Sequence, residues 1–296
     1  MLALIWTITF VINKVLRALL GVFLRVVARY RREVVRENLL RVYPNWNRVQ
    51  LLALERGFYN YLGGLLWDLL RSSVGAKDLG QKKIQWENPE VLLDLAAQNK
   101  SLVLLTSHYG NWEWIAQAMG ARFKHRIWFV YKPLQWTAAE NWLRKWRTNR
   151  HVVPVALKAL RSKLASENLS SSFPLALYLG ADQSPTAHSR WIPSFFLGQP
   201  TAVYQGPEEL CRTYGLTPVR IGIRPLPSIG SYAIRFERPG LKWSEAEHGS
   251  LMHWYMNALS QQIHEAPEYW LWTHRRWKLN RELGLDGPTQ DQITHA

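Results

Sequence analysis

An α/β fold is the class that this sequence predicts, with a mixed, mostly parallel sheet covered by helices. Short apolar runs such as 102–106 alternate with segments of helical patterning, which is typical of strands that are buried on both faces. Apolar residues make up 47% of the 296 residues, which excludes a disordered chain and allows a core of ordinary size.

The alternation of strands and helices begins near residue 101. Strands are expected at 102–106, 127–131, 174–179, 217–224 and 232–237. Helices are expected at 112–122, 137–149, 155–167, 202–214 and 244–265. Upstream, helices are expected within 33–72, broken at 44–47 with Asn47 as a possible N-cap, and at 89–98. Residues 31–281 therefore form one predicted domain, and 282–296 a polar tail.

The charge balance restricts the partners. Lys and Arg number 37 against 22 Asp and Glu, a net charge of +15, so nucleic acid, an anionic membrane surface and an acidic protein or substrate are all candidates. The 16 Trp and 12 Tyr favour the membrane, because such side chains concentrate at the membrane–water interface. The single Cys211 excludes an intramolecular disulfide and a multi-cysteine metal site.

The first 28 residues are apolar but interrupted. Lys14, Arg17 and Arg25 break a run that would need about 20 apolar residues to span a bilayer. Their spacing predicts one basic helical face, so residues 1–30 are expected to lie in the interface of an anionic membrane. Five further arginines extend that face: Arg29, Arg31, Arg32, Arg36 and Arg41. The alternative is an amphipathic helix packed on the domain.

The segment 107–113, Ser-His-Tyr-Gly-Asn-Trp-Glu, carries the chemistry. His108 follows a predicted buried strand, at the sheet edge where α/β proteins bind ligands. Gly110 allows a turn and Asn111 can cap the following helix, so Glu113 could meet the imidazole and orient it. His108 would then act as general base on a hydroxyl. The alternative is a histidine that caps a turn and a solvated glutamate.

At this point the sequence resembles the bacterial lipid A late acyltransferases, which share the His-x4-Asp/Glu signature of glycerolipid acyltransferases. The resemblance covers roughly residues 20–280. Further blocks in the same order are 31–39, 130–133, 147–150, 181–185, 195–202 and 270–278. Two departures are a short N-terminal apolar segment and the Asp-Gln-Ser-Pro form of the block at 182–185.

The resemblance implies a glycerolipid-acyltransferase-like fold and an activity without cofactor. A fatty acyl chain would pass from acyl carrier protein to a hydroxyl of a lipid A precursor or related glycolipid, at the cytoplasmic face of the inner membrane. It assigns His108 as general base and Glu113 as its partner. Because acyl carrier protein is acidic and lipid A carries phosphates, the positive charge of the chain suits both substrates.

Other residues have two interpretations each. Arg147 and Arg150 could bind a phosphate or phosphopantetheine, or form a solvated face. Asp182 could orient an arginine or His108, or belong to a turn. Residues 195–197 could line an acyl pocket but suit a core, and 270–278 could face headgroups, stack on single-stranded nucleic acid or fill the core. The histidines His125, His151 and His188 lack ligand spacing and His274 suits a structural role, so no metal is predicted.

The acceptor stays open, since a phospholipid or an aminolipid could replace the glycolipid. Outside enzymes, two alternatives remain: a basic membrane-surface protein and a nucleic-acid-binding protein. The common signatures of nucleic-acid-binding modules are missing from the sequence, so nucleic acid is not an expected partner.

Overall fold

The computed structural model describes residues 2–73, 79–169, 172–186, 189–240, 243–280, 282 and 284–285. Apart from residues 282, 284 and 285, the expected polar tail lies outside the described residues.

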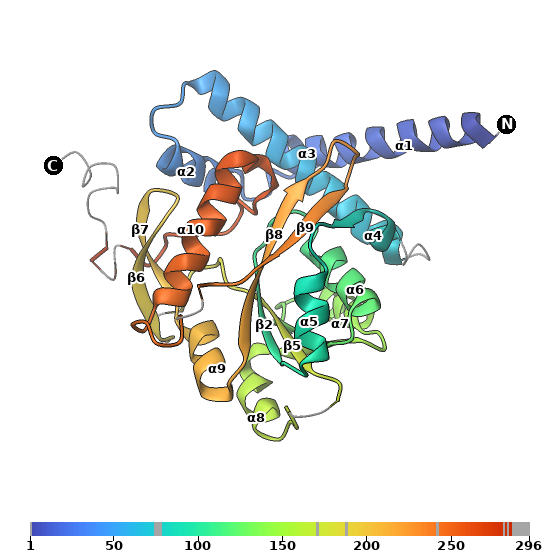
Figure 1. Ribbon diagram of the computed structural model, residues 1–296. Helices are drawn as coiled ribbons and strands as arrows, with labels where there is room; N and C mark the ends of the chain where they lie inside the picture. The colour runs from blue at the N-terminus through green and yellow to red at the C-terminus, as the bar shows by residue number, and fades with distance from the viewer. Residues whose placement is uncertain are drawn as a thin grey trace.

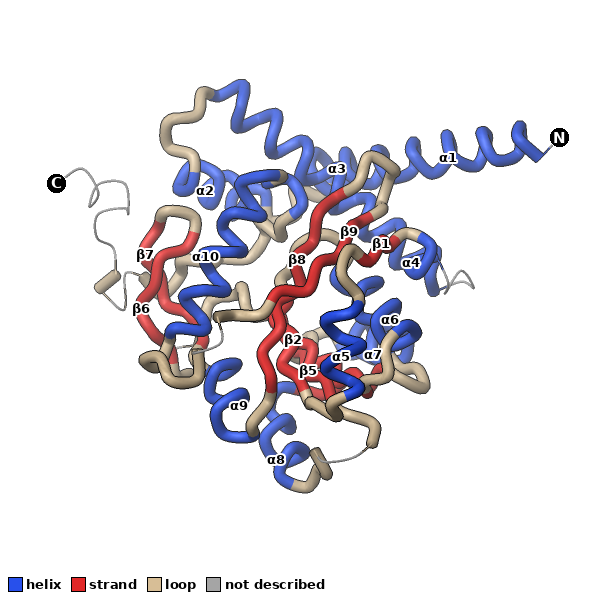
Figure 2. Tube along the Cα trace, in the orientation of Figure 1, coloured by secondary structure: helices blue, strands red, loops and turns tan. Residues whose placement is uncertain are grey.

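A seven-stranded sheet forms the centre of the molecule (Figure 2). Its strands, in spatial order, are β1 (Ile84–Trp86), β9 (Tyr232–Glu237), β8 (Thr217–Pro225), β2 (Leu102–Thr106), β5 (Leu175–Gly180), β3 (Arg126–Tyr131) and β4 (Val152–Ala156). Neighbouring strands are parallel except for the antiparallel pair β8–β9. Strand β2 is buried along its whole length, as a central strand of a covered sheet must be.

Helices flank this sheet (Figure 1). Helix α6 (Trp112–Arg122) packs on β3 and β4, whereas α9 (Gly206–Tyr214) packs on β2 and β8 and α10 (Ser250–Glu265) on β8. The other helices from residue 79 onwards are α4 (Leu79–Lys82), α5 (Glu90–Ala97), α7 (Thr137–Arg147), the 3-10 turn η2 (Leu157–Ala159), α8 (Leu160–Ala165) and the 3-10 turn η3 (Pro267–Tyr269). The predicted fold class, a mostly parallel mixed sheet flanked by helices, is confirmed.

Four strands were not expected from the sequence. Strand β4 occupies the start of the expected helix 155–167, and the hairpin β6 (Trp191–Phe196) and β7 (Gln199–Tyr204) includes the start of the expected helix 202–214. Their prolines argue against strands in the sequence. In the structure these prolines are tolerated, because Pro154 lies in an edge strand and Pro193 and Pro200 lie in a two-stranded hairpin, where a missing N–H costs little. Strand β1 is only three residues long.

The N-terminal region is helical: α1 (Leu2–Val22), a π-helical turn η1 (Phe23–Val27), α2 (Arg32–Val42) and α3 (Arg48–Ser73). The expected cap at Asn47 is confirmed, since its Oδ1 accepts the Gln50 N–H at 3.0 Å. The first turns of α1 extend beyond the rest of the molecule (Figure 1). Among the described residues, no helix combines the length and the apolar character that a membrane crossing requires.

Helices α1 and α3 cross at two glycines. A Cβ on Gly63 would lie 2.6 Å from the Arg17 carbonyl oxygen, and one on Gly21 would lie 2.7 Å from that of Tyr59. Both backbones therefore approach too closely for any side chain at these positions. The crossing is reinforced by an ion pair between Arg17 and the buried Asp68.

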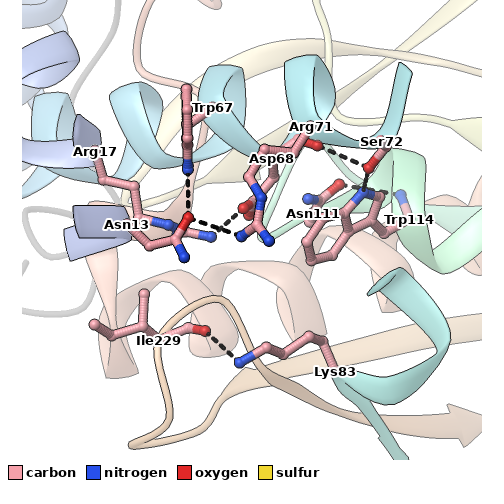
Figure 3. A network of polar contacts seen from close by, with 10 residues as sticks. All are labelled: Asn13, Arg17, Trp67, Asp68, Arg71, Ser72, Lys83, Asn111, Trp114 and Ile229. Carbon is pink, nitrogen blue, oxygen red and sulfur yellow. Dashed lines mark hydrogen bonds and ion pairs between the residues drawn. The ribbon is translucent and has the colours of Figure 1, made fainter. Parts of the chain in front are cut away.

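Figure 3 shows this ion pair within a polar network that reaches α6. Asn13 on α1 accepts hydrogen bonds from Trp67 and Arg71 on α3 at 2.9 and 2.8 Å. Further along α3, the Ser72 hydroxyl accepts the indole N–H of Trp114 at 2.8 Å. A continuous set of contacts therefore connects the N-terminal helix with the first turn of α6.

The orientation of the N-terminal basic face differs from the expectation. Arg17 binds Asp68, while Arg25, Arg32 and Arg36 all bind the buried Glu55 of α3. These arginines face the protein because two buried carboxylates need cationic partners. The exposed face of α1 and η1 is apolar instead, and its side chains are Val11, Ile12, Val15, Leu19, Val22, Phe23, Val26 and Val27.

We expect Gly63→Val to destabilise the protein by about 1–3 kcal/mol, because the new side chain overpacks the crossing of α1 and α3. Urea unfolding measures the effect. The matched control is Gly206→Ala on α9, where an added Cβ meets nothing within 4 Å. Equal stability of the two variants would show that α1 does not pack on α3 as described.

Candidate active site

The site is built at the carboxyl ends of two neighbouring parallel strands. Strand β2 pairs with β5 so that Thr106 lies beside Gly180, and His108 and Asp182 follow two residues later on each strand. This register brings residues 74 positions apart into contact. A Cβ on Gly180 would lie 2.9 Å from His108 Cε1, so glycine provides the space for the imidazole.

Asp182 holds His108 by two hydrogen bonds. Its Oδ1 lies 2.8 Å from His108 Nδ1, and its Oδ2 accepts the His108 backbone N–H at 3.0 Å. The indole N–H of Trp270 donates to the same Oδ2 at 2.9 Å. Because a carboxylate accepts, Nδ1 carries the hydrogen and Nε2 carries the lone pair. Nε2 lies 3.4 Å from the side-chain nitrogen of Gln183.

The charge of this pair is set by its surroundings. Burial lowers the pKa of the His108 imidazole, but the negative charge and hydrogen bond of Asp182 outweigh burial and raise the pKa above its ordinary value. Burial likewise raises the pKa of Asp182, but His108 and the Trp270 hydrogen bond prevail and lower it to about 2. Asp182 is therefore ionised throughout the physiological range.

Glu113 does not orient His108 by a hydrogen bond, in contrast to the expectation. Its two carboxylate oxygens bind Arg147 Nε and Nη2 at 2.9 and 2.5 Å, in a buried bidentate pair. The Arg147 guanidinium also lies 4.5 Å from the centre of the Phe129 ring. The capped turn directs Glu113 towards the last turn of α7, where Arg147 is a stronger hydrogen-bond partner for a carboxylate than His108.

The turn between β2 and α6 is fastened from several sides. Gly110 has φ +59, which favours glycine, and its carbonyl accepts the Tyr61 hydroxyl at 2.7 Å. Asn111 caps α6 as expected, since its Oδ1 accepts the Trp114 N–H at 3.0 Å. The carbonyl of Thr106 accepts the Tyr255 hydroxyl at 2.6 Å. This bonding rigidifies the segment that presents the imidazole.

A cavity of about 1380 Å³ opens over His108 and contains Asn111, Glu113 and Arg147 in its lining. One part of its wall is apolar: Leu65, Leu69, Leu134, Leu143 and Leu157. Another part is cationic and includes Arg29, Arg31, Arg275 and Lys278. The arrangement suits a substrate that combines a hydrocarbon chain with an anionic group.

The remaining candidates are placed as follows. Arg150 is exposed and does not line this cavity. Phe196 and Leu197 are in the core, as favoured. Within 270–278, Trp270, Trp272 and Trp277 are buried, so this block neither faces headgroups nor stacks on nucleic acid through them. Arg276 is buried with them.

His274 has a structural contact, because its Nε2 accepts the Ser184 backbone N–H at 3.0 Å. Burial lowers the pKa of its imidazole to about 4, so it is neutral. Among the described residues, no cluster of three or more His, Cys, Asp or Glu side chains is arranged to hold a metal ion.

Sequence reasoning missed Trp270 and Gln183 as members of the site. Gln183 adjoins Asp182, so its position after the same strand was the available signal. Trp270 is brought in by a β-bridge between Tyr109 and Trp270, which no local pattern announces.

We expect Glu113→Gln to destabilise the protein by about 3 kcal/mol, because it leaves the Arg147 charge buried without a carboxylate. Urea unfolding of Glu113→Gln, Arg147→Met and the double variant measures the coupling. The double variant should cost less than the sum of the single changes. The control is the more exposed pair Arg126 and Glu167, for which the same double-mutant cycle should give a coupling energy of about 1 kcal/mol at most. A coupling energy no larger than this for Glu113 and Arg147 would contradict the burial described.

Comparison with known proteins gives one family match. The sequence pattern of the bacterial lipid A biosynthesis acyltransferases matches residues 1–279, which is nearly the whole chain. A search of curated proteins found no match. Because this match covers far more than half of the chain, the chain belongs to the bacterial lipid A biosynthesis acyltransferase family.

Proposed function

We propose that this acyltransferase acts at a membrane and moves a fatty acyl chain from acyl carrier protein to a hydroxyl of a lipid A precursor or related glycolipid. The observation that carries the proposal is the His108–Asp182 pair, whose Nε2 lone pair is available at the cavity. An imidazole fixed in this tautomer is suited to take a proton from a substrate hydroxyl.

The reaction follows from that tautomer. Nε2 of His108 takes the hydroxyl proton as the oxygen attacks the thioester carbonyl carbon. The new C–O bond forms, the C–S bond breaks, and the imidazolium returns its proton to the departing thiolate. Asp182 stabilises the imidazolium between these steps, which is the role that the sequence had suggested for Glu113.

Glu113 and Arg147 act as a pair in this scheme. Glu113 holds the guanidinium of Arg147 at the cavity wall, beside the start of α6. The positive end of the α6 dipole, which begins at Trp112, favours the negative charge that develops on the carbonyl oxygen. Asn111 supports this end of the helix as its cap.

The exposed apolar face of α1 and η1 supports action at a membrane. From Val11 to Val27 its side chains recur at helical spacing, and more than 45% of each is exposed. Lys14 is exposed on the same helix. An apolar face of this length, on a chain with a net charge of +15, fits the interface of an anionic bilayer. We place the enzyme at the cytoplasmic face of the inner membrane, where acyl carrier protein has access.

We expect Asp182→Asn to lower kcat for acyl transfer by about 10²- to 10⁴-fold. A neutral imidazole is the active base, so activity rises as pH increases through the pKa of His108. Because Asp182 raises that pKa, its replacement should also move the rising limb of the pH profile to lower pH. The assay follows transfer of a laurate or myristate from acyl carrier protein to a lipid A precursor at several pH values.

The control for this experiment is Asp94→Asn on the exposed side of α5, which should leave both rate and profile unchanged. His108→Ala should abolish the rising limb altogether. Full activity in His108→Ala would refute the proposed mechanism.

We expect Leu19→Glu with Val26→Glu to weaken binding to anionic vesicles by at least about tenfold, because two apolar contacts are replaced by charges that the surface repels. Co-sedimentation with vesicles measures it. The control is Val49→Glu with Leu93→Glu, two exposed apolar residues away from α1 and η1. If both double variants bind equally, the apolar face is not the membrane contact.

A further inference from the structure

The lining of the catalytic cavity has an unequal charge. Eight of its side chains are Lys or Arg, and two are Glu. Three of the cations are already paired with carboxylates: Arg147 with Glu113, and Arg32 and Arg36 with Glu55. In the described part of the chain, Arg29, Arg31, Lys132, Arg275 and Lys278 form no ion pair. Among the described residues, Glu33 is the other acidic side chain in the lining, so the five cations without an ion pair leave the cavity with a surplus of positive charge.

Four of these residues form what we call the cationic rim: Arg29, Arg31, Arg275 and Lys278. They lie on two segments that hydrogen bonds fasten together. Arg31 Nη1 donates to the Thr273 carbonyl at 3.1 Å, and Asn38 donates to the carbonyls of Trp272 and His274 at 2.8 Å. The second segment is attached to the catalytic turn, since Leu271 N–H donates to the His108 carbonyl at 2.9 Å. The rim is thus fixed relative to His108.

The backbone of the first segment is unusual. Arg29 and Arg31 both have left-handed backbone conformations, with φ of 45° and 50°, which are strained for residues other than glycine. They follow directly on the π-helical turn η1. Both strained positions of this turn therefore carry an arginine, and both arginines line the cavity. Strain of this kind is concentrated where the surrounding structure holds a residue for a task.

We infer that the cationic rim is a phosphate-binding site that positions a phosphorylated substrate with its reacting group at His108. Three guanidinium groups present planar forks of donors, which match phosphate oxygens, and the ammonium of Lys278 adds a fourth positive charge. The inference rests on the proposed function and adds to it the group by which a substrate is recognised and the residues that recognise it.

The phosphate could belong to either substrate, as a phosphate of the glycolipid or as the phosphodiester of phosphopantetheine. The position of the rim favours the glycolipid. Arg29 comes two residues after Val27, the last member of the exposed apolar face, so the rim lies where that face ends. If that face contacts the acyl region of the membrane, the rim is close to the level of the headgroups.

The test compares two double variants with the wild type. One combines Arg29→Gln and Arg31→Gln, and the other combines Arg275→Gln and Lys278→Gln. The acceptor is offered as the phosphorylated lipid A precursor and as the same glycolipid after enzymatic removal of its phosphates. Both double variants should raise KM for the phosphorylated acceptor about tenfold with little change in kcat. Neither should change KM for the dephosphorylated acceptor. The control is Lys124→Gln with Arg238→Gln, two exposed cations outside this cavity.

A second arm varies the donor by comparing acyl phosphopantetheine with acyl pantetheine. A rise in KM confined to acyl phosphopantetheine would support a phosphate site and assign its phosphate to the donor. Equal KM values for all substrates in the wild type and both rim variants would overturn the inference.

A third arm separates this inference from the proposed function. It measures binding of wild type and rim variants to neutral phosphatidylcholine vesicles that contain the phosphorylated or the dephosphorylated glycolipid. Tighter binding to the phosphorylated form, lost in the rim variants, would support the site even if no acyl transfer occurred. Loss of transfer with no preference for phosphate in the wild type would reject both.

Discussion

The contact between His108 and Asp182 depends on the parallel register of β2 and β5. Neither residue lies within a strand, yet each follows its strand by two positions, so the pairing of Thr106 with Gly180 decides where they meet. A slip of one residue would turn the following side chains to the other face of the sheet. The buried apolar residues of both strands resist such a slip, and the core is therefore what keeps the imidazole in place.

Much of the fold could be predicted because its central segments are locally consistent. The bounds of β2, α6 and β9 agree with those expected from apolar runs, a turn and an N-cap. The prolines of β4, β6 and β7 made edge and hairpin strands resemble loops or helices. The local sequence pattern predicts the structure of a segment well only where its tertiary packing favours the same residue types.

The sequence predicted which residues belong to the candidate site better than it predicted which of them bond to one another. His108, Glu113, Arg147 and Asp182 all line or support one cavity, but Asp182 rather than Glu113 bonds the imidazole. Spacing along the chain suggested the nearer carboxylate, whereas the sheet brought in one from a strand 74 residues away. The same holds for the basic N-terminal face, because only the fold reveals the buried Glu55 and Asp68 that attract its arginines. Those two carboxylates explain why the apolar face of α1 is left outside.

The β-bridge between Tyr109 and Trp270 has a consequence for biosynthesis. Trp270 lies near the end of the described chain, and its indole completes the shell around Asp182. The ribosome delivers His108 and Asp182 long before this tryptophan emerges, and domains fold in the order of synthesis. A nascent chain that already contains the whole central sheet would still lack the hydrogen bond from Trp270 to Asp182. The hydrogen bonding around Asp182 is therefore completed only after Trp270 has emerged, later than all seven strands of the central sheet.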